Sequence, residues 1–592
     1  MSARSAHRSE VAGPKGSRIR ILRLLTRAGI LAPARLDRTV RQLTIVARWG
    51  ATVAGGYRAA AARSPQRIAV IDERREVTFG ELHRRAVRLA NGLEDLGVAP
   101  GSRVAVLCRN HAWFVETVVA CAELGADVML LNTGLAPRAT AEVLRSHSPA
   151  LVVADAEFAE HVAVARLDTP VIIAWPDGPA SGSGGVGAWP GSGRPARVAV
   201  QPIAAGRPGN AFGSAGSAWS SGAFRAAGTV DDIIAAAGPR KRRPPKVPGR
   251  LIVLTSGTTG APKGAYRANP PGLAAAAALL SRIPLRSCES VLVATPLFHM
   301  WGLAALQIGM ALRNTLILQR AFEPKAALRA IAEHRCSVVF GVPVVLQRIL
   351  ELPPGLRDGF DTDSLRVVAT SGAPIPSPVV TAFLDVFGEV LYNFYGSTEV
   401  SWAAIADPAD LRIAPTTAGR PPLDSRLKVL DEHGAIVPRG VTGRIFVWND
   451  MLFEGYTTGA TKEYRGGYMA TNDRGHLDSS GRLFVHGRDA DMIVCGGERL
   501  FPREVEDLLS ALPEVREAAV VGVPDGDLGQ RFAAYVVVRP GAELSAPQVR
   551  GVVARHLAGA TVPRDVVFVD ALPRNATGKV MVRDLPPSLT GN

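Results

Sequence analysis

Short apolar runs alternate with longer amphipathic stretches along most of the chain from about residue 51. The runs are short and rich in Val, Ile, Leu and Ala, which predicts buried strands, and the stretches carry apolar residues at helical spacing. The runs lie at 68–71, 103–108, 127–131 and 151–154, and the helical stretches at 79–96 and 113–124. Such alternation predicts an α/β body with mixed sheets, largely parallel, and flanking helices, which we place at residues 51–487.

The last part of the chain, residues 488–592, has a different pattern. Its predicted strands are at 518–523, 533–538 and 566–568, and its predicted helices at 503–511 and 546–556. A segment of this length suits one small α+β domain. A chain of 592 residues in which 47% are hydrophobic is long and apolar enough for two such units.

Two segments fall outside this pattern. Residues 1–50 are basic and contain an amphipathic helical stretch at 18–31, which either docks on the body or lies on an anionic membrane surface. Residues 174–250 are rich in Gly, Ser, Pro and Arg, which predicts a flexible surface insertion. Within it, residues 229–237 are a candidate for a short helix that begins at Thr229 or Asp231.

The charge of the chain belongs mainly to these two segments. Of the net charge of +15, residues 1–50 carry +9 and residues 174–250 carry +7, which leaves the rest near −1. A near-neutral body argues against nucleic acid as a partner. Five isolated cysteines, no long uncharged apolar run and no clear secretory signal predict a cytoplasmic protein, with peripheral contact at the inner face of the cell membrane as a further hypothesis.

The clearest chemical motif follows the apolar strand at 251–254. The string LTSGTTGAPKG spans residues 254–264, and it lacks the spacing of a Walker A loop. Glycines allow successive backbone N–H groups to point at a phosphate, and hydroxyls and a lysine add donors and charge. The residues expected to contact phosphate are Thr255, Ser256, Gly257, Thr258, Thr259, Gly260 and Lys263.

With this loop the sequence resembles the adenylate-forming superfamily of acyl-CoA synthetases, peptide-synthetase adenylation domains and luciferases. Overall it is most similar to bacterial medium- and long-chain fatty-acid–CoA ligases. The resemblance covers about residues 51–585. It implies a large adenylate-forming domain, a small mobile C-terminal domain, and ATP, Mg²⁺ and coenzyme A as cofactor or co-substrates.

Further strings match this superfamily in order. ATPLFHMWG at 294–302 implies that His299 and Trp301 lie beside the acyl group. TSGAP at 370–374 implies that Gly372, Ala373 and Pro374 pack on adenine. YNFYGSTE at 392–399 implies adenine stacking by Tyr395, contacts from Gly396, Ser397 and Thr398, and a Mg²⁺ ligand in Glu399.

The C-terminal strings complete the resemblance. TNDRG at 471–475 resembles a turn whose aspartate, here Asp473, binds the ribose hydroxyls, and Asn472 stands there for a glycine. The resemblance also implies that Arg488 lies near the ribose and that Ala490 is the hinge. PRNATGK at 573–579 implies that Lys579 bridges carboxylate and α-phosphate. Coenzyme A is expected beside Gly496, Gly497 and Glu498.

This resemblance implies a fatty-acid–CoA ligase that forms an acyl-adenylate and then a thioester, with Lys579, Glu399, Lys263 and Thr398 as the catalytic groups. Charge neutralisation and positioning suffice for the first step. Residues 303–310 and 338–346 line an acyl tunnel or form ordinary core. Three alternatives stay open: a fatty acyl-AMP ligase that delivers to a carrier protein, an aryl or other non-fatty acid ligase, and a non-catalytic binding protein.

Overall fold

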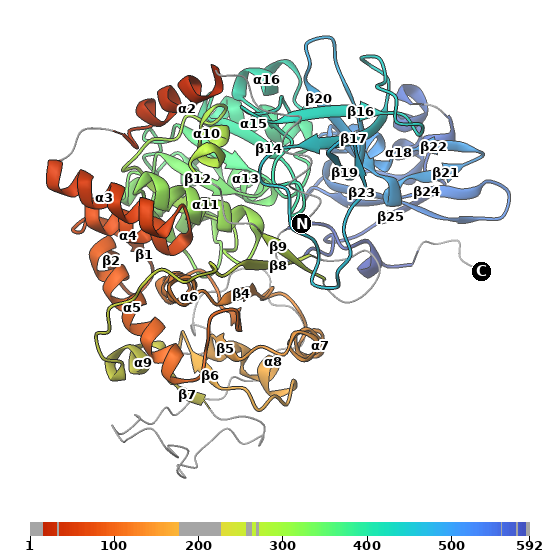
Figure 1. The fold of residues 1–592 in the computed structure, drawn as a ribbon. Coiled ribbons are helices and arrows are strands. Elements are labelled where there is room, and N and C mark those ends of the chain that lie inside the picture. Colours follow the sequence, from red (N-terminus) through yellow and green to blue (C-terminus); the bar gives the residue numbers. More distant parts are fainter. Residues whose placement is uncertain are drawn as a thin grey trace.

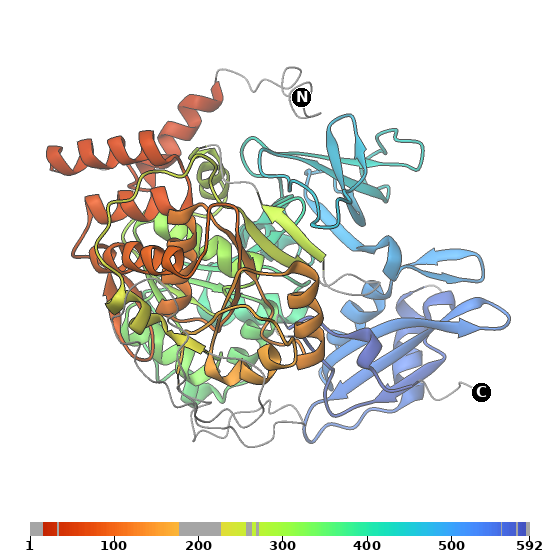
Figure 2. The same ribbon diagram turned by 60° about the horizontal axis from the view of Figure 1, so that its bottom comes forward.

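The computed structural model describes residues 16–31, 35–176, 226–255, 263–267, 272–557, 559–575 and 578–587. Within these ranges the strands form four sheets, of eight, seven, five and five strands. Three sheets with their helices make a large N-terminal body, and the fourth belongs to a smaller C-terminal unit on the side away from the N-terminal helices (Figures 1 and 2). The predicted fold class is confirmed.

The seven-stranded sheet is parallel apart from one edge pair, β8 with β9. Its order is β7 (Ala226–Thr229), β6 (Val171–Ile173), β5 (Leu151–Ala154), β3 (Arg103–Leu107), β4 (Asp127–Leu130), β8 (Leu251–Thr255) and β9 (Lys263–Arg267). Its central strands are fully buried, as their unbroken apolar runs predict for a sheet covered on both faces.

The eight-stranded sheet is parallel except at its two edges, where β2 and β15 run antiparallel to their neighbours. Its order is β15 (Ala404–Ala406), β14 (Leu391–Tyr395), β13 (Val367–Thr370), β12 (Val338–Gly341), β10 (Ser290–Val293), β11 (Thr315–Leu318), β1 (Ile68–Ile71) and β2 (Glu76–Thr78). Three of the sequence motifs follow the ends of β10, β13 and β14. They therefore meet at one edge of the sheet, where ligands of α/β folds commonly bind.

Helices cover these two sheets. They include α4 (Val53–Arg63), α5 (Phe79–Asp95), α6 (Ala112–Leu124), α7 (Pro137–His147), α8 (Ala159–Ala163), α9 (Val230–Ala236), α10 (Ala274–Leu280), α11 (Met300–Leu312), α12 (Pro324–Glu333), α13 (Pro343–Leu350), α14 (Pro354–Arg357), α15 (Ser377–Phe387) and α16 (Pro408–Ile413). Side-chain caps fix several helix starts; Thr78, for example, accepts the N–H of Glu81 at 3.1 Å.

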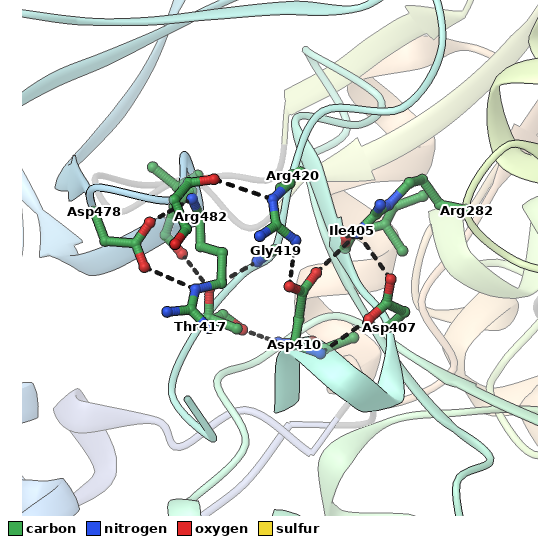
Figure 3. A network of polar contacts seen from close by, with 12 residues as sticks. Arg282, Ile405, Asp407, Asp410, Thr417, Gly419, Arg420, Asp478 and Arg482 are labelled. Carbon is green, nitrogen blue, oxygen red and sulfur yellow. Dashed lines mark hydrogen bonds and ion pairs between the residues drawn. The ribbon is translucent and has the colours of Figure 1, made fainter. Parts of the chain in front are cut away.

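The third sheet is antiparallel and is joined to the eight-stranded sheet by an ionic network around the buried Asp410 (Figure 3). It contains β16 (Arg426–Leu430), β17 (Gly443–Trp448), β18 (Tyr464–Arg465), β19 (Tyr468–Leu477) and β20 (Leu483–Arg488). Asp410, only 4% exposed, binds Arg282 at 2.8 Å and also Arg420, whose Nε donates to the carbonyl of Ser480 at 3.3 Å. The network thus fixes the β19–β20 hairpin relative to β14 and β15.

The C-terminal unit packs two helices against a mixed sheet. The strands are β21 (Ile493–Cys495), β22 (Glu498–Leu500), β23 (Val515–Asp525), β24 (Gly529–Val538) and β25 (Asp565–Phe568), and the helices are α17 (Pro502–Ser510) and α18 (Ala546–His556). Side chains from all of these elements meet in one apolar cluster, which includes Ile493, Val505, Phe532, Val549 and Val566, and against which Leu500 of β22 packs.

The N-terminal helices α2 (Gly16–Arg27) and α3 (Leu36–Trp49) dock on the large body. Leu25, Ala28 and Ile30 are at most 6% exposed and belong to its main core. Trp49 lies under the guanidinium of Arg58, which is 3.9 Å from the ring centroid. The docking interpretation of this amphipathic segment therefore holds for its inner face.

The ends of the segment 174–250 differ from the expectation of a flexible insertion, whereas residues 177–225 lie outside the described residues. Trp175 is 7% exposed, and residues 226–236 form β7 and the short helix expected there, which Thr229 caps. Ile233 packs so closely on Gly92 that a Cβ there would lie 2.3 Å away. Arg242 donates to Asn91 Oδ1 at 2.8 Å. The composition of residues 174–250 could not predict the contacts of Ile233 and Arg242, because their partners belong to α5, which is far away in sequence.

None of the described helices is both long and apolar enough to cross a membrane.

Candidate active site

A cavity of about 810 Å³ lies where the first three sheets meet the C-terminal unit. Ten of the residues predicted from the sequence line it: Lys263, His299, Trp301, Gly372, Gly396, Ser397, Thr398, Glu399, Arg488 and Lys579. Among the described side chains, the predicted residues that do not line it are Ala373, Pro374, Tyr395, Asp473, Gly496, Gly497 and Glu498. The side chain of Thr255 lies outside the described part of the chain. Ser256, Gly257, Thr258, Thr259 and Gly260 fall outside the described residues.

Glu399 is the acidic centre of the cavity's ionic end. Its side chain accepts hydrogen bonds from Tyr456 Oη at 2.6 Å and from Ser397 Oγ at 2.8 Å. Burial alone would raise its pKa, but the charge of Lys462 and these hydrogen bonds outweigh burial and hold the pKa below its usual range. Glu399 is therefore ionised at neutral pH, as a Mg²⁺ ligand must be.

Lys462 also lines the cavity, and sequence reasoning missed it. Its Nζ donates to the carbonyl of Thr471 at 2.8 Å, and burial lowers its pKa. The only available signal was its place in the loop between the YNFYGSTE and TNDRG strings, where a single lysine has no distinctive spacing.

Tyr395 and Asp473 face each other behind the cavity wall. The hydroxyl of Tyr395 donates to Asp473 Oδ2 at 2.6 Å, and Arg488 Nε lies 3.6 Å from Asp473 Oδ1. Burial raises the pKa of Asp473 despite both partners. The phenol thus orients the carboxylate, which is a contact that the motif strings do not reveal.

The TNDRG string forms a bulge within β19, whereas the sequence predicted a turn. In β19 the three residues from Thr471 to Asp473 lie opposite a single residue of β17, Ile445. On either side of them the regular pairs are Ala470 with Phe446 and Arg474 with Arg444. Asn472 has φ of 68°, the left-handed conformation expected of an asparagine that replaces glycine. The bulge brings Asn472 to the cavity.

A buried arginine that also lines the cavity holds the end of the YNFYGSTE string in place. Arg267, 6% exposed, donates to the carbonyl of Thr398 at 2.8 Å and to Ser401 Oγ at 2.6 Å. Burial lowers its pKa to about 10, so it stays charged at neutral pH. These bonds fix the backbone that carries Thr398 and Glu399.

A tight hairpin in the C-terminal unit presents Lys579. The side chain of Asn575 accepts the N–H of Lys579 at 3.0 Å, and the N–H of Asn575 donates to the carbonyl of Lys579 at 2.9 Å. Arg574 donates to the carbonyl of Gly578 at 2.6 Å and pairs with Glu517 at 2.6 Å. Burial, and then the charge of Arg488, lowers the pKa of Lys579. Burial and a neighbouring positive charge both disfavour the charged form of Lys579, and an anionic ligand would stabilise that form.

The segment expected beside coenzyme A lies elsewhere. Gly496 and Gly497 form the two-residue turn between β21 and β22, with φ of 59° and 86°, and Glu498 is exposed. None of the three lines the cavity, because in this arrangement the C-terminal unit turns Lys579 towards it instead. Ala490, the expected hinge, does line it.

Beyond the ionic end the cavity wall becomes apolar and aromatic. Trp301, 3% exposed, donates to the carbonyl of Ala369 at 3.3 Å and lies 4.6 Å from Phe394, centroid to centroid. His299 caps α11, and burial lowers its pKa to about 4, so it is neutral. One face of α11 lines the cavity, with Ala304, Gln307, Ile308, Met310 and Ala311. Residues 338–346 do not line it and are core.

The N-terminal helices build the far end of the same cavity. Ile30, Gln42, Val46 and Gly50 line it together with Arg313, which follows α11. Sequence reasoning did not predict this role, because Gln42 and Val46 follow the ordinary spacing of a docked helix, and Ile30, Gly50 and Arg313 follow helix ends without any distinctive motif.

A buried polar cluster outside the cavity is structural. Ligand atoms of Cys108, His111 and Asp155 lie within 4.8 Å of one another. However, the two ring nitrogens of His111 bond Asp155 at 2.8 Å and the N–H of Phe114 at 3.2 Å. Asp155 also accepts the N–H of Arg109 at 2.9 Å. The cluster therefore caps α6 and offers no free histidine nitrogen to a metal.

Known proteins share both parts of this architecture. The profile of AMP-binding enzymes matches residues 57–457, and that of the AMP-binding enzyme C-terminal domain matches residues 504–579. Feruloyl-CoA synthase of an Amycolatopsis species is 32% identical over 88% of this chain and 95% of its own length. The 3-[(3aS,4S,7aS)-7a-methyl-1,5-dioxo-octahydro-1H-inden-4-yl]propanoyl:CoA ligase of Mycobacterium tuberculosis is 33% identical over 93% and 97%.

Among solved structures, o-succinylbenzoate CoA synthetase (MenE) of Bacillus subtilis in complex with its acyl-adenylate intermediate is similar. The TM-score is 0.73 with 25% identity, and the match covers 91% of this chain and 99% of that one.

Proposed function

This chain belongs to the AMP-binding enzyme family, and we propose that it is an AMP-forming acid–coenzyme A ligase for an acid with an aromatic or polycyclic skeleton. One observation carries the proposal: a single cavity joins a cationic, phosphate-compatible end, with Lys263, Lys462, Arg488 and Lys579, to a wide apolar end. Such a cavity can hold a nucleotide and a bulky acid with the two reacting groups adjacent.

The proposed acid differs from the fatty acid expected from the sequence. Feruloyl-CoA synthase and the dioxo-octahydroindenyl-propanoyl:CoA ligase act on ring-bearing acids by name, and both cover most of this chain. The apolar wall includes Phe298, Trp301, Phe394 and Trp402, whose flat rings suit a rigid ring system. The alternative of a non-fatty acid ligase therefore has more support than a fatty-acid ligase.

In the first half-reaction a carboxylate oxygen attacks the α-phosphorus of ATP, and pyrophosphate leaves. Lys579 lies between the carboxylate and the α-phosphate and screens their repulsion, with Lys263, Lys462 and Thr398 on the phosphates. We place adenine beside Gly372, with Tyr395, Ala373 and Pro374 behind it, and the ribose beside Arg488, which Asp473 pairs from behind the cavity wall. Glu399 would hold Mg²⁺, which when bound neutralises phosphate charge.

In the second half-reaction the coenzyme A thiolate attacks the acyl carbonyl and AMP leaves. No nucleophilic side chain is needed, because the adenylate is already a good leaving group. We place the division between a large domain, 51–487, and a small domain, 488–592. Rotation near Ala490 would withdraw Lys579 and bring Gly496, Gly497 and Glu498 to the acyl carbonyl.

The test is pyrophosphate release from ATP with a panel of acids, namely cinnamic and indole acids, polycyclic propanoic acids and straight-chain fatty acids, each with and without coenzyme A. We expect turnover with ring-bearing acids and formation of the acyl-CoA thioester. The same panel run on Lys579→Ala identifies any contaminating activity. Turnover with fatty acids alone would reject the proposed acid, and release with no acid at all would reject the ligase.

A second proposal concerns the outer face of α3. Leu36, Val40 and Leu43 are 80%, 55% and 62% exposed, and their spacing places them on one face of the helix. Arg41 and Arg48 of the same helix are exposed, as is Arg35 just before it. An apolar stripe flanked by arginines fits the surface of an anionic membrane, where an apolar acid would also gather.

A further inference from the structure

The far end of the cavity contains an arginine that lacks the partners of a structural one. Arg313 lines the cavity and is 4% exposed, at a position with φ of 56° just after α11. One guanidinium nitrogen, Nη2, donates to the carbonyl of Gly29 at 3.2 Å. The other, Nη1, is buried and has no oxygen acceptor among the described residues, and the thiol of Cys288, a weak acceptor, bonds the guanidinium.

The electrostatic surroundings of Arg313 are also unbalanced. Within the described ranges no carboxylate pairs with it, whereas the charges of Arg63 and Arg67 both act on it. Burial, and then Arg63, lowers its pKa. A buried cation beside other cations is costly, and proteins rarely keep one without an acceptor or a function.

Neighbouring groups do not supply the missing acceptor. Arg67 donates to the backbone carbonyl of Arg313 at 2.8 Å and, as a cation, offers no acceptor to the Arg313 guanidinium. Gln42, which also lines this end, uses its Oε1 to accept from Arg63 at 2.7 Å. Ile30, Val46 and Met310, which also line this end, are apolar. Because the Cys288 thiol is a weak acceptor, an oxygen of the ligand would bond the Arg313 guanidinium more strongly.

We propose that Arg313 binds an oxygen acceptor at the end of the acyl group opposite to the reacting carboxylate. The inference rests on the proposed function and narrows its substrate to ring-bearing acids with a distal ketone or second carboxylate. The shared chemistry is an oxygen that accepts from a guanidinium. A carboxylate would bind more tightly than a ketone, because it would also offset the charges of Arg63 and Arg67.

The experiment uses three propanoic acids on one two-ring skeleton: the unsubstituted acid, its far-ring ketone and its far-ring carboxylate. Pyrophosphate release at saturating ATP gives kcat/KM for each with the full-length protein. We expect the ketone to exceed the unsubstituted acid by about tenfold, equivalent to about 1.4 kcal/mol, with the carboxylate higher still. In Arg313→Met both ratios should approach one.

Arg67→Met is the matched control, since it removes an arginine that touches Arg313 but does not line the cavity. It should keep the ketone ratio of the wild type within about twofold. An equal fall for all three acids in Arg313→Met would show that the arginine only holds Gly29, and would overturn the proposal.

If Arg313→Met does not fold, the wild-type protein still tests the proposal. Equal kcat/KM values for the three acids in the wild type would overturn it. Arg313→Lys, which keeps the charge but not the fork of donors, should then retain preference for the carboxylate over the ketone. Failure of the proposed function has a different signature, namely no pyrophosphate release from any of the three acids.

Discussion

The two ends of the cavity are built in different ways. At the ionic end, short strings supply polar side chains whose contacts are local, as in the Asn575–Lys579 hairpin and the Ser397–Glu399 pair. At the far end, Ile30, Gln42, Val46 and Arg313 come from segments almost 300 residues apart and share no string. Ile30, Gln42 and Val46 also precede the matched family region, which begins at residue 57.

This difference separates chemistry from selectivity. Transfer to the α-phosphate requires fixed charges, which only certain residue types in fixed order provide. Recognition of the acyl skeleton requires a shape, which many combinations of apolar side chains produce. We therefore expect substitutions at the ionic end to affect every acid, and substitutions at the far end to change the ranking of acids.

The largest effect is expected from Lys579→Ala. Loss of one preorganised positive charge should lower adenylate formation by roughly 10²–10³-fold for every acid. Single-turnover pyrophosphate release measures this step, and thioester formation from supplied acyl-adenylate measures the other. Arg583→Ala, an exposed change in the same unit, is the control. Comparable losses in both half-reactions would contradict the role of Lys579.

A smaller loss is expected from Lys462→Met, again for every acid. A hydrogen bond to a charged group contributes about 1.5–3 kcal/mol, so turnover should fall about tenfold or more. Without Lys462 the pKa of Glu399 rises, because that charge is the largest influence lowering it. Glu399 acts as the carboxylate, so the acid limb of the pH–rate profile should move to higher pH. A limb that stays in place would disprove the coupling.

The two ends of the cavity also differ in how much of their structure could be predicted from the sequence. The apolar runs predicted the five strands β1, β3, β4, β5 and β8 of the large body within one or two residues, because unbroken buried runs leave little choice. The strings predicted which loops meet, but not Lys462 or the support from Arg267, whose partners lie more than 100 residues away. Nothing predicted the far end, since Val46 or Ile30 in a docked helix looks the same whether a cavity or a side chain faces it.

Gly56→Leu should change the far end alone. Gly56 lines the cavity, and even a Cβ there would lie 2.4 Å from the Met310 sulfur, so a leucine must displace Met310 and occupy cavity space. We expect kcat/KM for a polycyclic acid, relative to a single-ring acid, to fall by about tenfold, because filling a pocket by a few carbons costs about 1–3 kcal/mol.

Gly551→Leu in α18 is the matched control, because it places the same side chain in a helix where Arg555, 3.6 Å from the new Cβ, is the nearest neighbour. It should leave the ratio of the two acids at its wild-type value. If Gly56→Leu reduced both acids by the same factor, the far end would not be the site of discrimination.

The smallest effect is expected where the N-terminal helices face outwards rather than into the cavity. Replacing Leu36, Val40 and Leu43 by Gln should weaken binding to vesicles of anionic lipid by a few-fold, because partly inserted side chains recover only part of the roughly 1.5–3 kcal/mol of full burial. Ile413→Gln removes an equally exposed apolar side chain from α16 and should leave binding unchanged. Turnover of a water-soluble acid should stay near wild type in both variants, since none of these positions lines the cavity.

Vesicle co-sedimentation at low and high salt measures the binding, and the arginine contribution of about 1 kcal/mol per side chain should disappear at high salt. Unchanged co-sedimentation of the triple variant would restrict the N-terminal helices to their inner role at the far end of the cavity.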